Sequence, residues 1–170
     1  MKTLVLNSTP LIYITKAGVG RVLEELQNNK ITSPSVKREV VDREKQKGIP
    51  DALALEKLFE RNVLMVCEPK NKAFLSTLAS TRGLHLADAE ILALAHELDA
   101  IAIIDDEVAR KTAKIYGISY VGSSYLLMRA VCEGLISKTK AKQAVNDMVS
   151  AGWRCSIESY VKIMEALEKL

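Results

Sequence analysis

The chain has 170 residues, of which 48% are apolar and 26% charged, with a formal net charge of +3. This fits one domain of ordinary size with an aliphatic core, and the small charge permits polyanion binding without arguing for it. The first apolar run, Leu4–Leu6, is too short for a signal peptide or a membrane span.

The three cysteines, Cys67, Cys132 and Cys155, are widely separated and odd in number. They have neither Cys-x-x-Cys nor Cys/His zinc spacing, so we expect free thiols in a reducing compartment. Together with the short first apolar run, this predicts a cytoplasmic protein with no membrane segment.

Five short apolar segments, each bounded by turn or polar residues, predict β-strands. They are Thr3–Leu6, Lys30–Thr32, Val63–Cys67, Ala100–Ile104 and Ile118–Val121. The segment Ala100–Ile104 is apolar throughout, which is typical of a strand that is buried on both faces.

Helical patterns lie between the strands. Thr9 is expected to cap a first helix with Pro10 at its first position, and Ser33-Pro34 gives the same start signal for the next. Further helices are expected at Val36–Glu44, Pro50 to Arg61, Leu86–Leu98, Glu107–Tyr116, Ser124–Glu133, and twice within 138–170 with a break near Gly152. The alternation predicts a three-layer α/β/α fold with a central, mostly parallel five-stranded sheet.

Polar residues follow the predicted strands at the end of the sheet where sites form in open parallel sheets. Asn7 follows the first strand, and Asp105 and Asp106 follow the fourth. Glu39 lies on the helix after the second strand, and Asp88 lies at the start of the helix before the fourth.

The position of Asp88 in its helix is informative. Ile91, Leu92 and Ala95 stand three, four and seven residues after it and share one helix face with it. The carboxylate is therefore expected on or beside the face toward the core. The alternative is an ordinary acid in the first helical turn, where the helix dipole favours negative charge.

The other acids have competing interpretations too. Glu39 borders the apolar face formed by Val36 and Val40, or it is a solvated residue of a charged helix. Asp105 and Asp106 repel each other unless cations or hydrogen bonds compensate them, and one of them can cap the following helix. Together these acids offer hard oxygen ligands, which suit Mg²⁺ or Mn²⁺ rather than zinc.

Several motifs resemble the PIN domain, a ribonuclease fold. In chain order they are STPLIYITKAG, ITSPSVKREVV, LADAEILALA, IIDDEVARKTA, GISYVGSSYLLMRAVCEGLI and AGWRCSIESYVKIMEAL. They are similar to an uncharacterised prokaryotic PIN branch that itself resembles the toxins of VapC-type toxin–antitoxin pairs. The resemblance covers nearly the whole chain and implies one PIN-like domain, 1–170, with a C-terminal helical extension at about 135–170.

The resemblance also implies that three or four acids hold one or two Mg²⁺ or Mn²⁺ ions for RNA hydrolysis. Carried over, Asn7 takes the place of the first aspartate, Glu39 and Asp88 are the second and third acids, and Asp105 or Asp106 is the last. Asn7 departs from the pattern, because an amide oxygen can bind a metal but supplies no charge. The loss should weaken metal binding and lower the pKa values of the remaining acids.

By the same resemblance, Ser8 and either Ser123 or Ser124 line the site. His85, three residues before Asp88, could reach the cleft or lie at the surface. Cationic residues on the helix after Asp106 are either candidates for RNA phosphates or ordinary surface charges. These are Arg110, Lys111 and Lys114.

Two functions follow as hypotheses. The first is a metal-dependent ribonuclease, the toxin of a toxin–antitoxin pair with an antitoxin protein as partner. The second is a PIN-like module that binds nucleic acid or protein and has weakened or lost activity because of Asn7. A homodimer is a further expectation from apolar residues at helical spacing in the tail, which could equally pack on their own sheet. These residues are Tyr160, Ile163, Met164 and Leu167.

Two other acidic folds fit poorly. A phosphoacceptor receiver domain needs an acceptor aspartate after the third strand, where this chain has Glu68-Pro69. A phosphatase of the haloacid-dehalogenase type needs Asp-x-Asp after the first strand, where the chain has Asn7-Ser8-Thr9.

Overall fold

The computed structural model describes residues 1–43 and 51–170. Its five strands form a sheet in the order β3-β2-β1-β4-β5, and every neighbouring pair is parallel. The strands are β1 (Leu4–Leu6), β2 (Lys30–Thr32), β3 (Met65–Val66), β4 (Ile101–Ile103) and β5 (Tyr120–Val121). All five predicted strands are confirmed, although only β2 has the expected bounds and the other four are shorter than expected.

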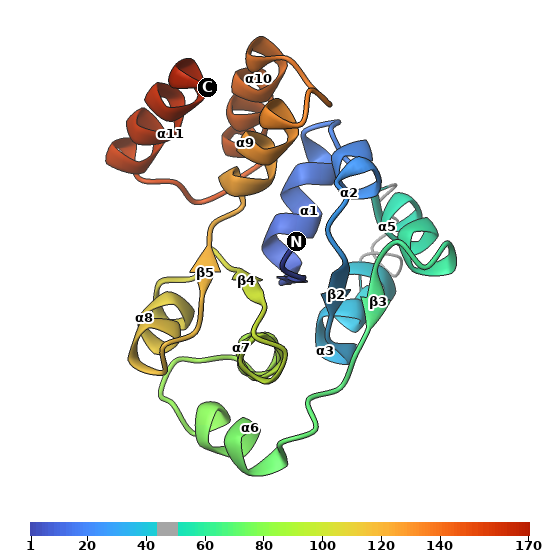
Figure 1. Cartoon of the computed structure of the whole chain (residues 1–170), viewed down its shortest axis with the longest axis vertical. Coiled ribbons are helices and arrows are strands. Elements are labelled where there is room, and N and C mark those ends of the chain that lie inside the picture. The colour runs from blue at the N-terminus through green and yellow to red at the C-terminus, as the bar shows by residue number, and fades with distance from the viewer. Residues whose placement is uncertain (44–50) are drawn as a thin grey trace.

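Helices cover both faces of the sheet, as Figure 1 shows. One face carries α6 (Lys72–Ala79), α7 (Leu86–Glu97) and α8 (Glu107–Ile115). The other carries α1 (Ser8–Lys16), α2 (Arg21–Glu25), α9 (Ser124–Cys132) and α10 (Lys138–Ser150), with α11 (Ile157–Lys169) against α10. Near β2 and β3 lie α3 (Pro34–Lys37), the π-helix η1 (Arg38–Arg43) and α5 (Asp51–Glu60). The three-layer α/β/α prediction is confirmed.

The order of the strands creates a switch point between β1 and β4. From β1 the chain winds outward through β2 and β3, and then it crosses to the opposite side of β1 to form β4 and β5. The first residue beyond β1 still contacts β4 here, because the backbone amide of Asn7 donates to the carbonyl of Ile103, the last residue of β4, at 3.2 Å. In open α/β sheets such a switch point leaves a crevice outside the carboxyl ends of the strands.

The start of the first helix differs from the prediction. Asn7, not Thr9, is the N-cap of α1, and its Oδ1 accepts from the Ser8 amide at 2.9 Å. Pro10 therefore lies in the first turn, where its missing N–H leaves no helical carbonyl without a donor. The sequence does not decide between Asn7 and Thr9 as the capping residue, because asparagine and threonine both cap helices well.

The second predicted start is confirmed, since Ser33 Oγ accepts from the Val36 amide at 3.3 Å and Pro34 is the first helical residue. The helix predicted at Val36–Glu44 is present over the described residues, but it is not one continuous α-helix: α3 ends at Lys37, and Arg38–Arg43 forms a π-helix. The predicted end at Glu44 and the start at Pro50 lie outside the described residues. Two short helices, α2 and α6, were not predicted.

Helix α7 lies in the middle of its layer, against β1 and β4 and between α6 and α8. Every residue from Ala87 to Ala95 is buried, so this helix is apolar nearly all round. Two acids, Asp88 and Glu90, are exceptions, and each must find a polar partner inside the protein.

The C-terminal helices pack on the body of the chain. Leu167 is fully buried, and Tyr160, Ile163 and Met164 are partly buried against the core. The tail residues considered for a dimer therefore already pack within their own chain, where α11 lies against α10. Cys67, Cys132 and Cys155 are free thiols. Among the described residues, no helix has the length and apolar character needed to cross a membrane.

Candidate active site

A pocket of about 180 Å³ contains most of the residues that sequence analysis selected. It is lined by Asn7, Ser8, Thr9, Glu39, His85, Ala87, Asp88 and Asp106. Four separate segments contribute: the β1–α1 junction, η1, the start of α7 and the junction of β4 with α8. The pocket therefore lies at the switch point, where the order of the strands leads us to expect a site.

Asp88 is the most buried acid of the pocket, with 6% of its surface exposed. Its Oδ1 accepts from Asn7 Nδ2 at 2.6 Å, and its Oδ2 accepts from the His85 amide at 3.3 Å. Burial raises the pKa of Asp88, and the charge of Asp106 raises it further, while the bonds from Asn7 and His85 oppose the rise. The two interpretations of Asp88 from the sequence are compatible, because Asp88 is an acid in the first turn of α7 and also lines the pocket.

Asn7 links the first strand to this acid. The amide is used at both ends, because Oδ1 accepts from the Ser8 backbone and Nδ2 donates to Asp88. A carboxylate in the same place would face Asp88 as a like charge. The asparagine thus replaces a repulsive contact with a hydrogen bond, and in doing so it occupies one oxygen of Asp88.

Glu39 reaches the pocket from the first turn of the π-helix η1. Single π-helical turns inside helices are often found at functional sites, because they change the direction of the side chains. The preceding helix α3, which leads directly into η1, is anchored to α7 by the buried Glu90, whose carboxylate accepts from the Ser35 hydroxyl at 2.9 Å and the Ser35 amide at 3.2 Å. Sequence analysis missed this anchor, which lies two residues after Asp88.

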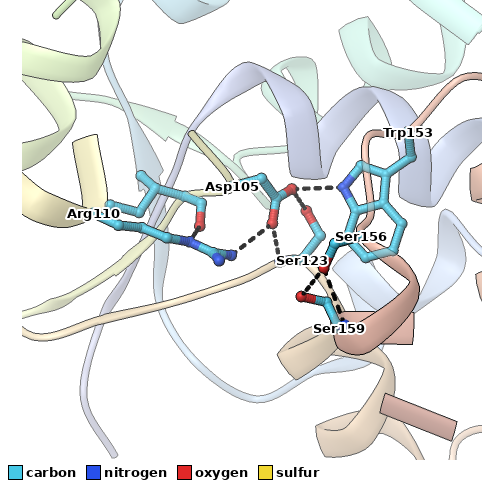
Figure 2. Close-up of polar contacts among 7 residues, drawn as sticks. Asp105, Arg110, Ser123, Trp153, Ser156 and Ser159 are labelled. Atoms are coloured by element: carbon cyan, nitrogen blue, oxygen red, sulfur yellow. Dashed lines mark hydrogen bonds and ion pairs between the residues drawn. The ribbon is translucent and has the colours of Figure 1, made fainter. Parts of the chain in front are cut away.

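Asp106 lines the pocket, and its Oδ1 caps α8 by accepting from the Ala109 amide at 2.9 Å. Asp105, the alternative, does not line it. Its carboxylate accepts instead from Arg110, Ser123 and Trp153, as Figure 2 shows. The structure therefore separates the two neighbouring acids that sequence analysis left as alternatives.

The remaining candidates divide in the same way. Ser8 lines the pocket, whereas Ser123 is fully buried and bonded to Asp105, so it has no surface to offer RNA. Arg110 donates to the Ile104 carbonyl at 3.0 Å and to Asp105. Lys111 pairs with Glu107 at 2.7 Å, and Lys114 is exposed further along α8. None of these three cations lines the pocket.

The charge balance of the pocket favours a cation. Glu39, Asp88 and Asp106 bring three carboxylates to it, and no lysine or arginine in the described part of the chain pairs with any of them. Such oxygen donors match the preference of Mg²⁺ and Mn²⁺. Within the described ranges, no three His, Cys, Asp or Glu side chains are yet arranged as ligands around one point. Asp88 and Asp106 instead accept from backbone amides at the starts of α7 and α8.

Comparison with models of known protein families identifies the family of this chain. A family model described as a PIN domain matches residues 3–169, which include the pocket and both C-terminal helices. No curated protein sequence gives a significant match.

Proposed function

The chain belongs to the PIN-domain family, and we propose that it is a metal-dependent nuclease that hydrolyses phosphodiester bonds of RNA. The observation that carries the proposal is the convergence of Glu39, Asp88 and Asp106 on one pocket at the switch point. These acids lie in three distant segments, so neither a single helix nor a single turn explains their meeting.

In the proposal, Glu39, Asp88 and Asp106 hold Mg²⁺ or Mn²⁺, and Asn7 is a neutral fourth group. A bound divalent ion supplies an activated water and stabilises negative charge on the phosphodiester. The raised pKa of Asp88 supports this assignment, because it means that the ionised carboxylate is costly until a positive charge compensates it. Asp105 has no part in the metal site, since its oxygens already accept from several donors.

The proposal also covers the substrate, the protein partner, the assembly and the cellular setting. The resemblance to VapC-type toxins supports RNA as substrate, an antitoxin protein as partner and a homodimer as assembly. Three free cysteines are compatible with a reducing, cytoplasmic setting. We treat residues 1–170 as one PIN-like domain whose extension, about 135–170, packs on the rest through α10.

Cleavage of single-stranded and structured RNA by the purified chain with Mn²⁺ tests the activity. We expect Asp88→Asn and Asp106→Asn to lower kcat by at least about a hundredfold, because each removes a charged metal ligand. Asp99→Asn is the matched control, since Asp99 is an exposed acid that pairs only with Lys2 among the described residues. Absence of cleavage by the unaltered protein, or full activity of both pocket variants, would contradict the proposal.

One observation favours a second function, a binding module without nuclease activity. The hydrogen bond of 2.6 Å from Asn7 to Asp88 satisfies a buried oxygen that a metal would otherwise use. If this bond holds the pocket in a metal-free state, calorimetry should detect no Mn²⁺ binding at millimolar concentration. Asn7→Asp should then restore binding, because it replaces the donor with a fourth negative charge. Equal metal affinity with and without this change would remove the argument from Asn7.

A further inference from the structure

The carboxylate of Asp105 joins three parts of the chain that are distant in sequence. Its Oδ1 accepts from the Ser123 amide at 2.9 Å and from Arg110 Nη2 at 3.2 Å. Its Oδ2 accepts from Trp153 Nε1 at 3.0 Å and from the Ser123 hydroxyl. Figure 2 shows these donors converging on the carboxylate. Only 10% of the Asp105 side chain is exposed, so the bonds are largely shielded from water.

Trp153 brings the C-terminal part of the chain into this network. It is the only tryptophan of the protein, it is 6% exposed, and it follows α10 after a turn at Gly152, whose φ is +102°. Cys155, two residues further on, lies near enough for Asp105 to raise the pKa of its thiol, after burial as the larger cause. The connection between α10 and α11 therefore lies against the end of β4.

The next residue after Asp105 is Asp106, which faces the pocket. Within the described residues, the amides of Asp105 and Asp106 donate to no backbone carbonyl, so the ladder of β4 ends before them. The contacts that hold this segment include the bonds to the Asp105 side chain, the capping bond of Asp106 and the bond from the Arg110 amide to the Asp106 carbonyl at 3.0 Å. A shift of Asp105 would move Asp106 directly, because the two share a peptide bond that is planar and rigid.

We propose that Trp153 is a positioning residue for the pocket: its indole N–H holds Asp105, and Asp105 holds Asp106 in place. This inference rests on the proposed function. It means that the C-terminal extension, through Trp153, helps to position a residue of the pocket. Groups that orient metal ligands from behind commonly change metal affinity or activity by about 10- to 100-fold when altered.

The test compares two variants of the full chain in which phenylalanine replaces an aromatic hydrogen-bond donor of the extension. Trp153→Phe removes the donor to Asp105. Tyr160→Phe, the matched control, removes a hydroxyl that donates to Asn146 Oδ1 at 2.7 Å, between α11 and α10. Mn²⁺ affinity is measured by calorimetry, kcat and KM by RNA cleavage, and folding by urea unfolding.

For Trp153→Phe we expect Mn²⁺ affinity and kcat to fall about tenfold with KM nearly unchanged, and for Tyr160→Phe we expect both within about twofold of the unaltered protein. In an Asp106→Asn background, Trp153→Phe should cause no further loss of Mn²⁺ affinity, because the group that it positions is gone. A merely structural role would give losses that follow stability and persist in that background. Should Trp153→Phe fail to fold, Ser123→Ala removes another donor to Asp105, and the same loss of affinity is expected.

The outcomes separate the two proposals. If the unaltered protein binds Mn²⁺ but cuts no RNA, while Trp153→Phe binds Mn²⁺ more weakly, then the nuclease proposal fails and the positioning role stands. If the protein cuts RNA and Trp153→Phe matches Tyr160→Phe in affinity and kcat, the positioning role is overturned and the nuclease stands. Absence of Mn²⁺ binding by the unaltered protein would overturn both.

Discussion

Asp105 and Asp106 are consecutive aspartates after one strand, yet their carboxylates lie in opposite environments. The first accepts from arginine, serine and tryptophan donors, while the second lines a pocket with Asp88 and Glu39 and accepts one backbone amide. A carboxylate whose oxygens all accept hydrogen bonds stabilises the fold. Carboxylates that lie close together and accept few hydrogen bonds repel one another, and a bound cation would compensate this repulsion. The comparison shows that donors around an acid, rather than its place in the sequence, indicate its role.

The largest expected difference between the two regions is in stability. In either orientation, Asp105→Asn places its amide N–H₂ against an N–H group that can only donate, from Trp153 or from Arg110 and the Ser123 amide, so we expect it to lower the free energy of unfolding by about 3 kcal/mol. Asp106→Asn should change the free energy of unfolding by less than about 1 kcal/mol, because asparagine caps a helix as well as aspartate does. Urea unfolding of both variants without metal checks this, and equal losses would erase the distinction.

A smaller effect is expected from Gly122, which lies under the same network. An added Cβ would come within 2.5 Å of Arg110 Nη2 and 3.1 Å of Asp105 Oδ1. Gly122→Ala should therefore break the partly exposed Arg110–Asp105 pair and lower the free energy of unfolding by about 1 kcal/mol. The same change made on top of Arg110→Ala should cost much less, and a full cost in that background would mean that Arg110 is not the group displaced.

The smallest effect concerns pH and the pocket itself. Burial and Asp106 raise the pKa of Asp88 above its ordinary value of 3.8, so the folded state holds the proton more tightly than the unfolded state. The free energy of unfolding of the metal-free protein should therefore fall as the pH rises from about 3.8 to the raised pKa and level off above it. Asp88→Asn should remove this fall, whereas Asp99→Asn should keep it; parallel curves for the protein and Asp88→Asn would contradict the assignment.

Much of this arrangement was predictable from the sequence. Asn7 was predicted as a site residue because it follows the first strand, and Glu39 and Asp88 because of their positions on helices beside apolar faces. The structure brings all three to one pocket. The choice between Asp105 and Asp106 was not predictable, because it depends on donors that come from β5 and from beyond α10. For the same reason Trp153 gave no sign of its contact, since its partner lies 48 residues away.

Local structure was harder to predict where competing signals are close together. Thr9 and Asn7 are both good N-caps, and the tertiary contact of Asn7 with Asp88 accompanies the earlier start. The π-helix that carries Glu39 has no recognisable sequence pattern, and its effect on side-chain direction emerges only in the folded chain.

Calorimetric titration of Mn²⁺ into the unaltered protein, Asp106→Asn and Asp99→Asn tests the central claim most directly. We predict that the unaltered protein and Asp99→Asn bind Mn²⁺ with similar affinity, and that Asp106→Asn binds at least about tenfold more weakly because it has lost a charged ligand. No binding by the unaltered protein, or the same affinity in Asp106→Asn, would contradict a metal site in this pocket.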